Sequence, residues 1–410
     1  MKLLKYLDFV NPVYKPKETD LICTFYLEPE GISLKEAAGG VAAESSVGTW
    51  TELSTEKPYV ARLAANVFSI EGNIAKIAYP IELFEPANMP NILSSVAGNV
   101  FGLKALKNLR LLDIQMPKEL LKSFNGPAFG IAGIRKLLKV PQRPLVGTII
   151  KPKLGLNTKD HAKVAYDAWS GGCDIVKDDE NLSSQKFNPF EERLVQTLES
   201  RDKAQEETGE RKVYMINITA ETSLMLKRAE AVVAQGGEYI MVDILTCGWS
   251  ALQTLKDQNY KLVIHAHRAG HAAFTKNQLH GIAMRSIATV ARIIGVDQLH
   301  VGTVVGKMSE TKAEVIENID ACKSEMCGLK PVLPVASGGL YPRLVPALLE
   351  TFGNDVILQA GGGIHGHPDG TIAGAKAMRQ AVTAFLERKT LEEYAKTHKE
   401  LKDALSQWKT

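Results

Sequence analysis

The residues best suited to chemistry lie in one short run, DIVKDDE at positions 174–180. Its apolar start predicts a buried strand, and Lys177 and Asp179 are two residues apart, so their side chains point the same way. Glu180 follows where the strand ends. Carboxylates supply the oxygen ligands that Mg²⁺ prefers. A lysine whose pKa falls below its usual ~10.4 presents a neutral amine, to which CO₂ can add to give a carbamate, one more anionic oxygen ligand.

This run therefore predicts a three-oxygen Mg²⁺ site made by carbamylated Lys177, Asp179 and Glu180, with positions left open for a substrate. Taken alone, the same run is equally compatible with a simple ion pair between the lysine and its acidic neighbours. The surrounding elements favour the metal site, because polar residues recur at equivalent places along the chain.

Eight apolar runs read as strands separated by helical segments, and most of them end in charged residues or glycines. The runs are 145–152, 174–180, 213–219, 239–244, 261–268, 298–304, 331–339 and 356–363. Eight strand–helix units over roughly 250 residues predict a (β/α)8 TIM barrel, whose active site forms at the carboxyl ends of the strands. An open doubly wound sheet would need a G-x-G-x-x-G fingerprint after its first strand, and GTIIKPKLGL does not supply one.

The strand ends carry two groups of candidate anion ligands. One group joins Arg268, His300 and Ser337, and Arg suits bidentate recognition of phosphate. The other is made of glycines whose backbone N–H groups could bind phosphate, or which could simply form tight turns: Gly338, Gly339, Gly361, Gly362 and Gly363. Two phosphate sites beside a metal site predict a small bisphosphate as substrate.

The histidines of IHAHRAGH leave a second interpretation open. His265 and His267 have an H-x-H spacing that also binds zinc, and amidohydrolase barrels combine it with a carbamylated lysine. Those barrels place H-x-H on the first strand and the lysine on the fourth, whereas here they fall on the fifth and second, so a hydrolase is disfavoured. His161 lies in a helical segment and is expected at the surface.

The first third of the chain has a different pattern. Residues 20–27 and 73–79 read as strands, and between them Ser33 and Glu36 have the spacing of a capping box that starts a helix at about 33–45. We therefore expect a small α+β domain over residues 1–125 and the barrel over residues 126–410.

Composition sets the remaining limits. The 410 residues are 45% hydrophobic and carry a net charge of +3, which gives no reason to expect nucleic acid or a membrane as partner. No apolar run approaches the ~18 residues of a membrane span, and the N-terminus lacks the apolar core of a signal peptide. The five cysteines form no CxxC pair, which favours a reducing cytoplasmic location.

Several of these segments, in this order, closely resemble the large subunit of ribulose-1,5-bisphosphate carboxylase/oxygenase (RuBisCO). They are AAESSVGTWTEL, AGNVFG, GTIIKPKLGL, DIVKDDEN, IHAHRAGHAA, LHVGTVVGK, PVASGG and LQAGGG. The resemblance covers essentially the whole chain and is greatest to the archaeal form III enzymes. It implies a (β/α)8 barrel with an N-terminal ferredoxin-like domain, Mg²⁺ as cofactor, and addition of CO₂ or O₂ to ribulose 1,5-bisphosphate, giving two 3-phosphoglycerates with CO₂.

The resemblance also implies a role for each matching residue. Lys177, Asp179 and Glu180 hold the metal; Lys151 is the acid/base, supported by Lys153; and His267 assists proton transfer. Arg268, His300 and Ser337 bind one phosphate, and the other phosphate is bound by Gly338, Gly339, Gly361 and Gly362 with Thr49 and Trp50. Lys307 stabilises CO₂, and Glu44 and Asn99 of the partner subunit complete the site. It implies a homodimer or an assembly of dimers without a small subunit, and a role in archaeal nucleoside (AMP) salvage.

Two positions depart from the family pattern. After Lys307 the family usually has Met or Leu followed by Glu-Gly, whereas this chain has Met308, Ser309 and Glu310, and Gly270 stands where the family usually has Met. Both are expected near a mobile loop and could change its closure. The alternative within this fold is a RuBisCO-like enolase or isomerase acting on a related sugar phosphate, for instance in methionine salvage. Such relatives replace several substrate residues that this chain keeps.

Overall fold

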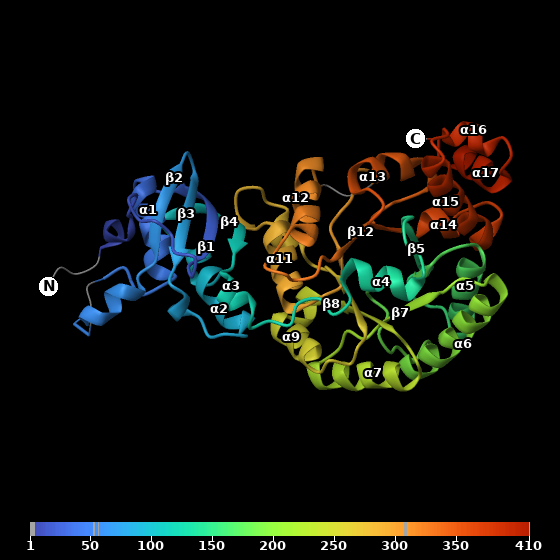
Figure 1. Ribbon diagram of the computed structural model, residues 1–410, viewed down its shortest axis with the longest axis horizontal. Coiled ribbons are helices and arrows are strands. Elements are labelled where there is room, and N and C mark those ends of the chain that lie inside the picture. Colours follow the sequence, from blue (N-terminus) through green and yellow to red (C-terminus); the bar gives the residue numbers. More distant parts are fainter. Residues whose placement is uncertain (1–4, 52–53, 56, 307–309, 410) are drawn as a thin grey trace. The chain divides into compact units, whose positions relative to one another are not determined.

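The computed structural model describes residues 5–51, 54–55, 57–306 and 310–409. The chain divides into two compact units, each described by itself (Figure 1). The first comprises Met1–Asn125 with Gly270–Ile294, and the second comprises Gly126–Ala269 with Gly295–Thr410. The inclusion of residues 270–294 in the first unit differs from the expected domains, whose boundaries of 1–125 and 126–410 stay a prediction.

The first unit is built on a mixed sheet in the order β10-β4-β1-β3-β2. Its strands are β1 (Leu21–Pro29), β2 (Asn66–Glu71), β3 (Ile74–Tyr79), β4 (Leu106–Gln115) and β10 (Gly281–Ile282). Alternate residues of β1 are buried, so one face of the sheet meets the core of this unit. The helices are α1 (Leu34–Glu44), α2 (Met89–Val96), α3 (Lys118–Leu121), α10 (Ala272–Thr275) and α11 (Met284–Ile294).

The predicted start of α1 is confirmed. Ser33 accepts a hydrogen bond from the backbone N–H of Glu36, and the Glu36 carboxylate accepts one from the backbone N–H of Ser33. This reciprocal capping satisfies two backbone donors that the first turn of a helix cannot pair internally. The helix ends at Glu44, one of the predicted site residues.

The second unit contains the predicted barrel, with all eight strands parallel and the sheet closed in the order β11-β12-β13-β5-β6-β7-β8-β9. Its strands are β5 (Leu145–Ile149), β6 (Ile175–Lys177), β7 (Val213–Asn217), β8 (Tyr239–Asp243), β9 (Val263–His267), β11 (Gln298–His300), β12 (Leu333–Ser337) and β13 (Ile357–Gln359). Each lies within one of the eight apolar runs, and the predicted architecture, a barrel with an N-terminal domain, is confirmed.

Helices surround the strands of this unit, as Figure 1 shows. They are α4 (Gly130–Leu138), α5 (Thr158–Ser170), α6 (Phe190–Thr208), α7 (Thr222–Ala234), α8 (Ile244–Cys247), α9 (Trp249–Asp257), α12 (Lys312–Lys323), α13 (Val345–Phe352), α14 (Gly362–His365), α15 (Gly370–Leu386), α16 (Leu391–Ala395) and α17 (Lys399–Gln407). Within the described ranges, no helix combines the length and apolar character needed to cross a membrane.

A buried apolar cluster fills the amino-terminal half of the barrel. Leu145, Ile175, Val213 and Val263, each at or near the start of its strand, pack together with Ile134 of α4. This cluster contains no charged side chain, whereas barrel active sites form at the carboxyl ends of the strands.

Candidate active site

The predicted site residues of the barrel lie at one rim. Lys177, His267, His300 and Ser337 are the last residues of β6, β9, β11 and β12. Since parallel strands of a closed barrel end at the same face, these side chains converge even though 160 residues separate the first from the last. The contacts described below confirm that they meet.

Lys177 is the most buried cation of this rim. Its side chain is fully enclosed, and its Nζ donates to the backbone oxygen of Asp178 at 2.7 Å and lies 3.1 Å from the sulfur of Met241. Burial lowers the pKa of this amine, although Glu180, at 3.7 Å, acts in the opposite direction. The amine is therefore held closer to its neutral, nucleophilic form than an exposed lysine would be.

Two carboxylates stand beside this amine. Asp179 is almost fully buried, and its Oδ2 accepts a hydrogen bond from Lys151 Nζ at 2.7 Å. Glu180 is partly exposed; burial opposes its ionisation, but the positive charge of Lys177 lowers its pKa, with His267 and Lys151 contributing. Both carboxylates thus face cationic side chains, Lys151 for Asp179 and Lys177 for Glu180.

The donor set at this rim is compatible with the predicted Mg²⁺ site. Among the described residues, no three His, Cys, Asp or Glu side chains are grouped to hold a metal ion. Asp179 and Glu180 supply two oxygen donors, and a carbamate on the buried amine of Lys177 would supply the third. The residues present therefore fit the predicted site, whose carbamate on Lys177 stays a prediction.

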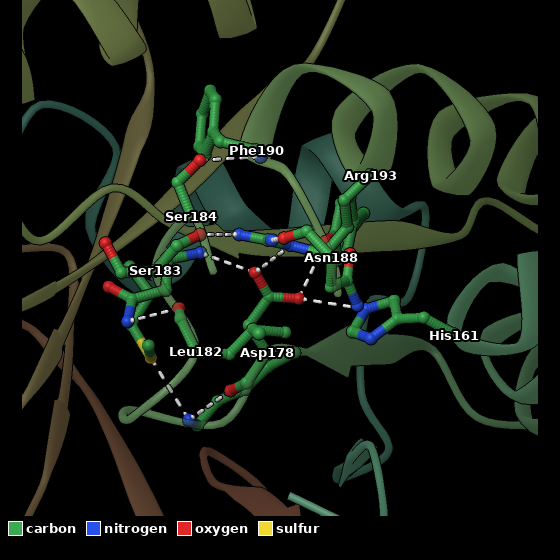
Figure 2. A network of polar contacts seen from close by, with 12 residues as sticks. His161, Asp178, Leu182, Ser183, Ser184, Asn188, Phe190 and Arg193 are labelled. Carbon is green, nitrogen blue, oxygen red and sulfur yellow. Dashed lines mark hydrogen bonds and ion pairs between the residues drawn. The ribbon is translucent and has the colours of Figure 1, made fainter. Parts of the chain in front are cut away.

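Asp178, between these ligands, points away from them into a buried network (Figure 2). Its carboxylate accepts hydrogen bonds from Tyr214 Oη at 2.6 Å, from the backbone N–H of Asn217 at 3.0 Å and from Arg193 Nε at 3.1 Å. Burial alone would raise the pKa of Asp178, but Arg193 and His161 overcome it and lower the pKa to about 2. A buried, charged Asp178 is thus fully compensated.

The same network corrects the prediction for His161. This histidine is 2% exposed, and its Nε2 lies 3.1 Å from Asp178 Oδ1, so it is not a surface group. Its helix, α5, carries His161 on the buried face together with Ala165 and Trp169. A polar residue on such a face needs a polar partner, and the partner, Asp178, directly follows the next strand, β6.

Arg193 and Asn217 extend the network to the loop after β6. Arg193 donates to the backbone oxygens of Ser183 and Asn188, and the amide of Asn217 donates to the backbone oxygens of Glu180 and Leu182. These bonds fix the backbone that carries Asp179 and Glu180. This support was not predicted from the sequence, because its donors come from other elements, α6 and β7.

His267 is oriented by a carboxylate that the sequence analysis did not select. Its Nδ1 lies 2.6 Å from Asp243 Oδ1, and its Nε2 lies 3.7 Å from Glu180 Oε2. Because a carboxylate only accepts, Nδ1 carries a proton, and Nε2 is the atom presented beside Glu180. Asp243 is the last residue of β8, so the rule that selected the other strand-end residues could have found it.

A chain of neutral hydrogen bonds leads to the proposed phosphate ligands. His265 Nδ1 donates to Gln298 Oε1 at 2.9 Å, His300 Nε2 meets His265 Nε2 at 2.9 Å, and Ser337 Oγ meets His300 Nδ1 at 2.7 Å. Burial lowers the pKa of His265 to about 3 and that of His300 well below its usual value. With His265 neutral, His300 donates from Nε2, so its Nδ1 accepts from the Ser337 hydroxyl.

Arg268 and the glycines complete the rim. Arg268 is 5% exposed; burial lowers its pKa, and its Nη2 pairs with Glu310 at 2.5 Å. Gly338 and Gly339 have φ of +118° and +76°, in the region that favours glycine. A Cβ on Gly361 would lie 3.1 Å from Lys151 Cε, so glycine there gives Lys151 room, while Gly362 begins α14.

Three predicted residues remain to be placed in this unit. Lys153, exposed, reaches Asn181 Oδ1 at 3.3 Å. Gly363 follows Gly362 in α14 and is buried. Lys307 lies outside the described residues.

The other predicted residues belong to the first unit. Glu44 accepts a hydrogen bond from Tyr6 Oη at 2.8 Å, which together with burial raises the pKa of that phenol. Glu44 and Trp50 line one cavity of about 670 Å³, and Trp50 is 81% exposed. Thr49 precedes Trp50, and the exposed Asn99 begins the short helix η4 (Asn99–Gly102). Their membership of the barrel site stays a prediction.

Comparison with known proteins agrees with these features along the whole chain. Residues 130–408 match the catalytic domain of the ribulose bisphosphate carboxylase large chain, and residues 8–120 match its N-terminal domain. Ribulose bisphosphate carboxylases of Methanocaldococcus jannaschii and Pyrococcus abyssi are 49% and 51% identical, over 98% and 100% of this chain and 100% and 98% of their own.

Solved structures agree equally well. An octameric RuBisCO from Pyrococcus horikoshii, in complex with sulfate, superposes with a TM-score of 0.96 at 51% identity and covers 99% of this chain and 97% of its own. A dimeric archaeal RuBisCO from Hyperthermus butylicus gives 0.92 at 44% identity, covering 98% and 99%. The resemblance to archaeal RuBisCO inferred from the motifs is thus confirmed: the chain belongs to the family of ribulose bisphosphate carboxylase large chains, which are carboxy-lyases.

Proposed function

We propose that this chain carboxylates ribulose 1,5-bisphosphate to two molecules of 3-phosphoglycerate, with O₂ as the competing gas, and that it needs Mg²⁺ and a carbamate on Lys177. One observation carries the proposal: the buried amine of Lys177, with its lowered pKa, stands at a barrel rim beside Asp179 and Glu180. Bound Mg²⁺ would polarise the substrate oxygens at this site. Family membership supports the choice of substrate.

Within this proposal, the side chains at the rim have different roles in the reaction. Lys151 Nζ moves the proton during enolisation and returns one to the product carbanion. His267 Nε2, fixed by the bond from Nδ1 to Asp243, assists proton transfer at the rim. Lys153 supports Lys151, and Lys307 stabilises the incoming CO₂.

The remaining residues hold the substrate. Arg268, His300 and Ser337 bind one phosphate. The second phosphate lies on glycine N–H groups from Gly338, Gly339, Gly361 and Gly362 with Thr49 and Trp50. Both assignments agree with the cationic and N–H donors placed at this rim.

The assembly is proposed to be a homodimer or a set of dimers, without a small subunit, in which Glu44 and Asn99 complete the partner's site. Solved relatives described as dimeric and octameric support oligomers of large chains. A cytoplasmic enzyme of archaeal nucleoside salvage is the proposed setting.

The test is incorporation of labelled CO₂. The protein is preincubated with bicarbonate and Mg²⁺, then given ribulose 1,5-bisphosphate, and label is sought in 3-phosphoglycerate. Activation should rise with pH, because deprotonation of Lys177 exposes the neutral amine that reacts with CO₂. Lys177→Ala should abolish both the label and the carbamate signal of ¹³C NMR.

Two outcomes would contradict the proposal. Exchange of the substrate's C3 proton with solvent, without any label in product, would identify an enolase of the same fold. Full activity of Lys177→Ala would remove the carbamate from the mechanism, whatever the substrate.

A further inference from the structure

The guanidinium of Arg268 is already engaged by an anion of this chain. Arg268 follows β9, and its Nη2 lies 2.5 Å from Oε1 of Glu310, which stands two residues before α12. The two side chains are only 6% and 11% exposed. A pair this enclosed is weakly screened by solvent and salt, so it persists unless another anion replaces the carboxylate.

A neighbouring glycine, Gly302, leaves space for the pair of Arg268 and Glu310. Gly302, just after β11, has φ of +96°, and a Cβ built on it would lie 3.2 Å from Glu310 Cδ and 3.3 Å from Arg268 Nη2. Any side chain at this position would press on the pair. The glycine therefore lets the carboxylate reach Arg268 at the rim.

The guanidinium also keeps an unused donor. Arg268 Nη1 is buried and makes no hydrogen bond within the described part of the chain. Buried N–H donors without a hydrogen-bond acceptor are rare in proteins, so an acceptor is expected for this nitrogen. A tetrahedral anion with several oxygens could bind both nitrogens at once, whereas Glu310 engages only Nη2.

We propose that Glu310 is an internal competitor for the phosphate site: its carboxylate occupies Arg268 until a phosphate group displaces it, and it thereby sets the affinity of this site for phosphate. This inference rests on the proposed role of Arg268 as a phosphate ligand. A carboxylate and a phosphate would repel each other at one buried guanidinium. Phosphate therefore binds only the fraction of molecules in which Arg268 is released, and its apparent dissociation constant rises by the inverse of that fraction.

The experiment measures binding of inorganic phosphate to the full-length protein by calorimetry. Glu310→Gln keeps the shape of the side chain but removes its charge, so it should bind phosphate about tenfold more tightly if about nine tenths of the wild-type molecules are paired. The gain should vanish when Arg268→Ala is combined with it, because the competition acts through that residue. Glu317→Gln, an exposed position on α12, makes the same charge change and should leave binding unaltered.

The outcomes separate this inference from the proposed function. Equal affinity in wild type and Glu310→Gln, with weaker binding in Arg268→Ala, would overturn the competition and leave Arg268 as a phosphate ligand. Undiminished binding in Arg268→Ala would remove both assignments, while CO₂ incorporation tests the activity separately. If Glu310→Gln does not fold, Glu310→Ser is the second neutral variant, and unchanged phosphate affinity there would count equally against competition.

Discussion

The two histidines of β9, His265 and His267, have different polar neighbours although they are only two residues apart. His265 lies between Gln298 and His300, and burial keeps it neutral. His267 instead has a carboxylate, Asp243, at 2.6 Å. Of these two histidines, only His267 has its tautomer fixed by a carboxylate side chain, which suits it to a repeated exchange of protons at Nε2.

Replacing Asp243 should separate this role from binding. In Asp243→Asn the amide can present either its oxygen or its nitrogen to His267, so the ring loses its fixed tautomer, and kcat for carboxylation should fall about 10–100-fold. The KM for ribulose bisphosphate should change little, since Asp243 has no proposed contact with substrate. Asp320→Asn, an exposed change on α12, is the control. A raised KM with unchanged kcat would show that Asp243 acts in binding instead.

At the scale of elements, β6 is a three-residue strand held at both ends by buried aspartates. Asp178 fixes the loop beyond its carboxyl end, as described above. Before its amino end, Asp174 accepts two hydrogen bonds from Arg143, at 2.6 and 2.7 Å, and one from the backbone N–H of Val146. The short strand that carries Lys177 is thus positioned by side chains rather than by its own length.

Asp174 should matter for stability and not for chemistry, because it lies at the barrel end opposite the rim. Asp174→Asn leaves Arg143 without its buried partner and should lower the free energy of unfolding by about 3–5 kcal/mol, measured by urea denaturation, with kcat unchanged. Asp167→Asn breaks a partly exposed pair with Lys163 and should cost only about 0.2–1 kcal/mol.

The same substitution should have a defined pH dependence. Burial opposes ionisation of Asp174, but Arg143 and Arg379 lower its pKa below the unfolded value. Its contribution is therefore present above the ordinary aspartate pKa and is lost as the pH falls through the folded pKa. The stability difference between wild type and Asp174→Asn should shrink in acid, and a constant difference would contradict this cause.

The strands were predictable from the sequence because each is an apolar run whose polar residues come at its end, and Lys177, Asp179 and Glu180 were found because they are neighbours in the chain. Side chains that reach the site from other elements could not be predicted in this way. Asp243 and Glu310 lie 24 and 42 residues from the side chains they bind. The burial of His161 likewise depends on its contact with Asp178. Contacts between residues that are distant in the chain cannot be read from a single sequence.

At the scale of the molecule, the proposed site draws on both compact units. Glu44 and Trp50 line a cavity of the first unit, while Lys177, Arg268, His300 and Ser337 belong to the second. The carboxylate of Glu44 accepts a hydrogen bond from the neutral Tyr6, and Glu44 is the last residue of a helix whose preceding residues are buried. In the proposed dimer, this carboxylate would complete the site of the partner subunit.

Complementation between inactive variants tests this shared site. Glu44→Gln impairs the contribution of the first unit and Lys177→Ala that of the barrel, so each homodimer should be nearly inactive. In a mixed dimer one site has both parts intact and the other has neither. Random exchange makes about half of the dimers mixed, so roughly a quarter of wild-type activity should return in a two-fold assembly. The matched control pairs Lys177→Ala with Asp179→Ala, where every site keeps a damaged barrel and no activity should return. If tagged subunits exchange and Glu44→Gln with Lys177→Ala still stays inactive, each barrel takes Glu44 from its own chain.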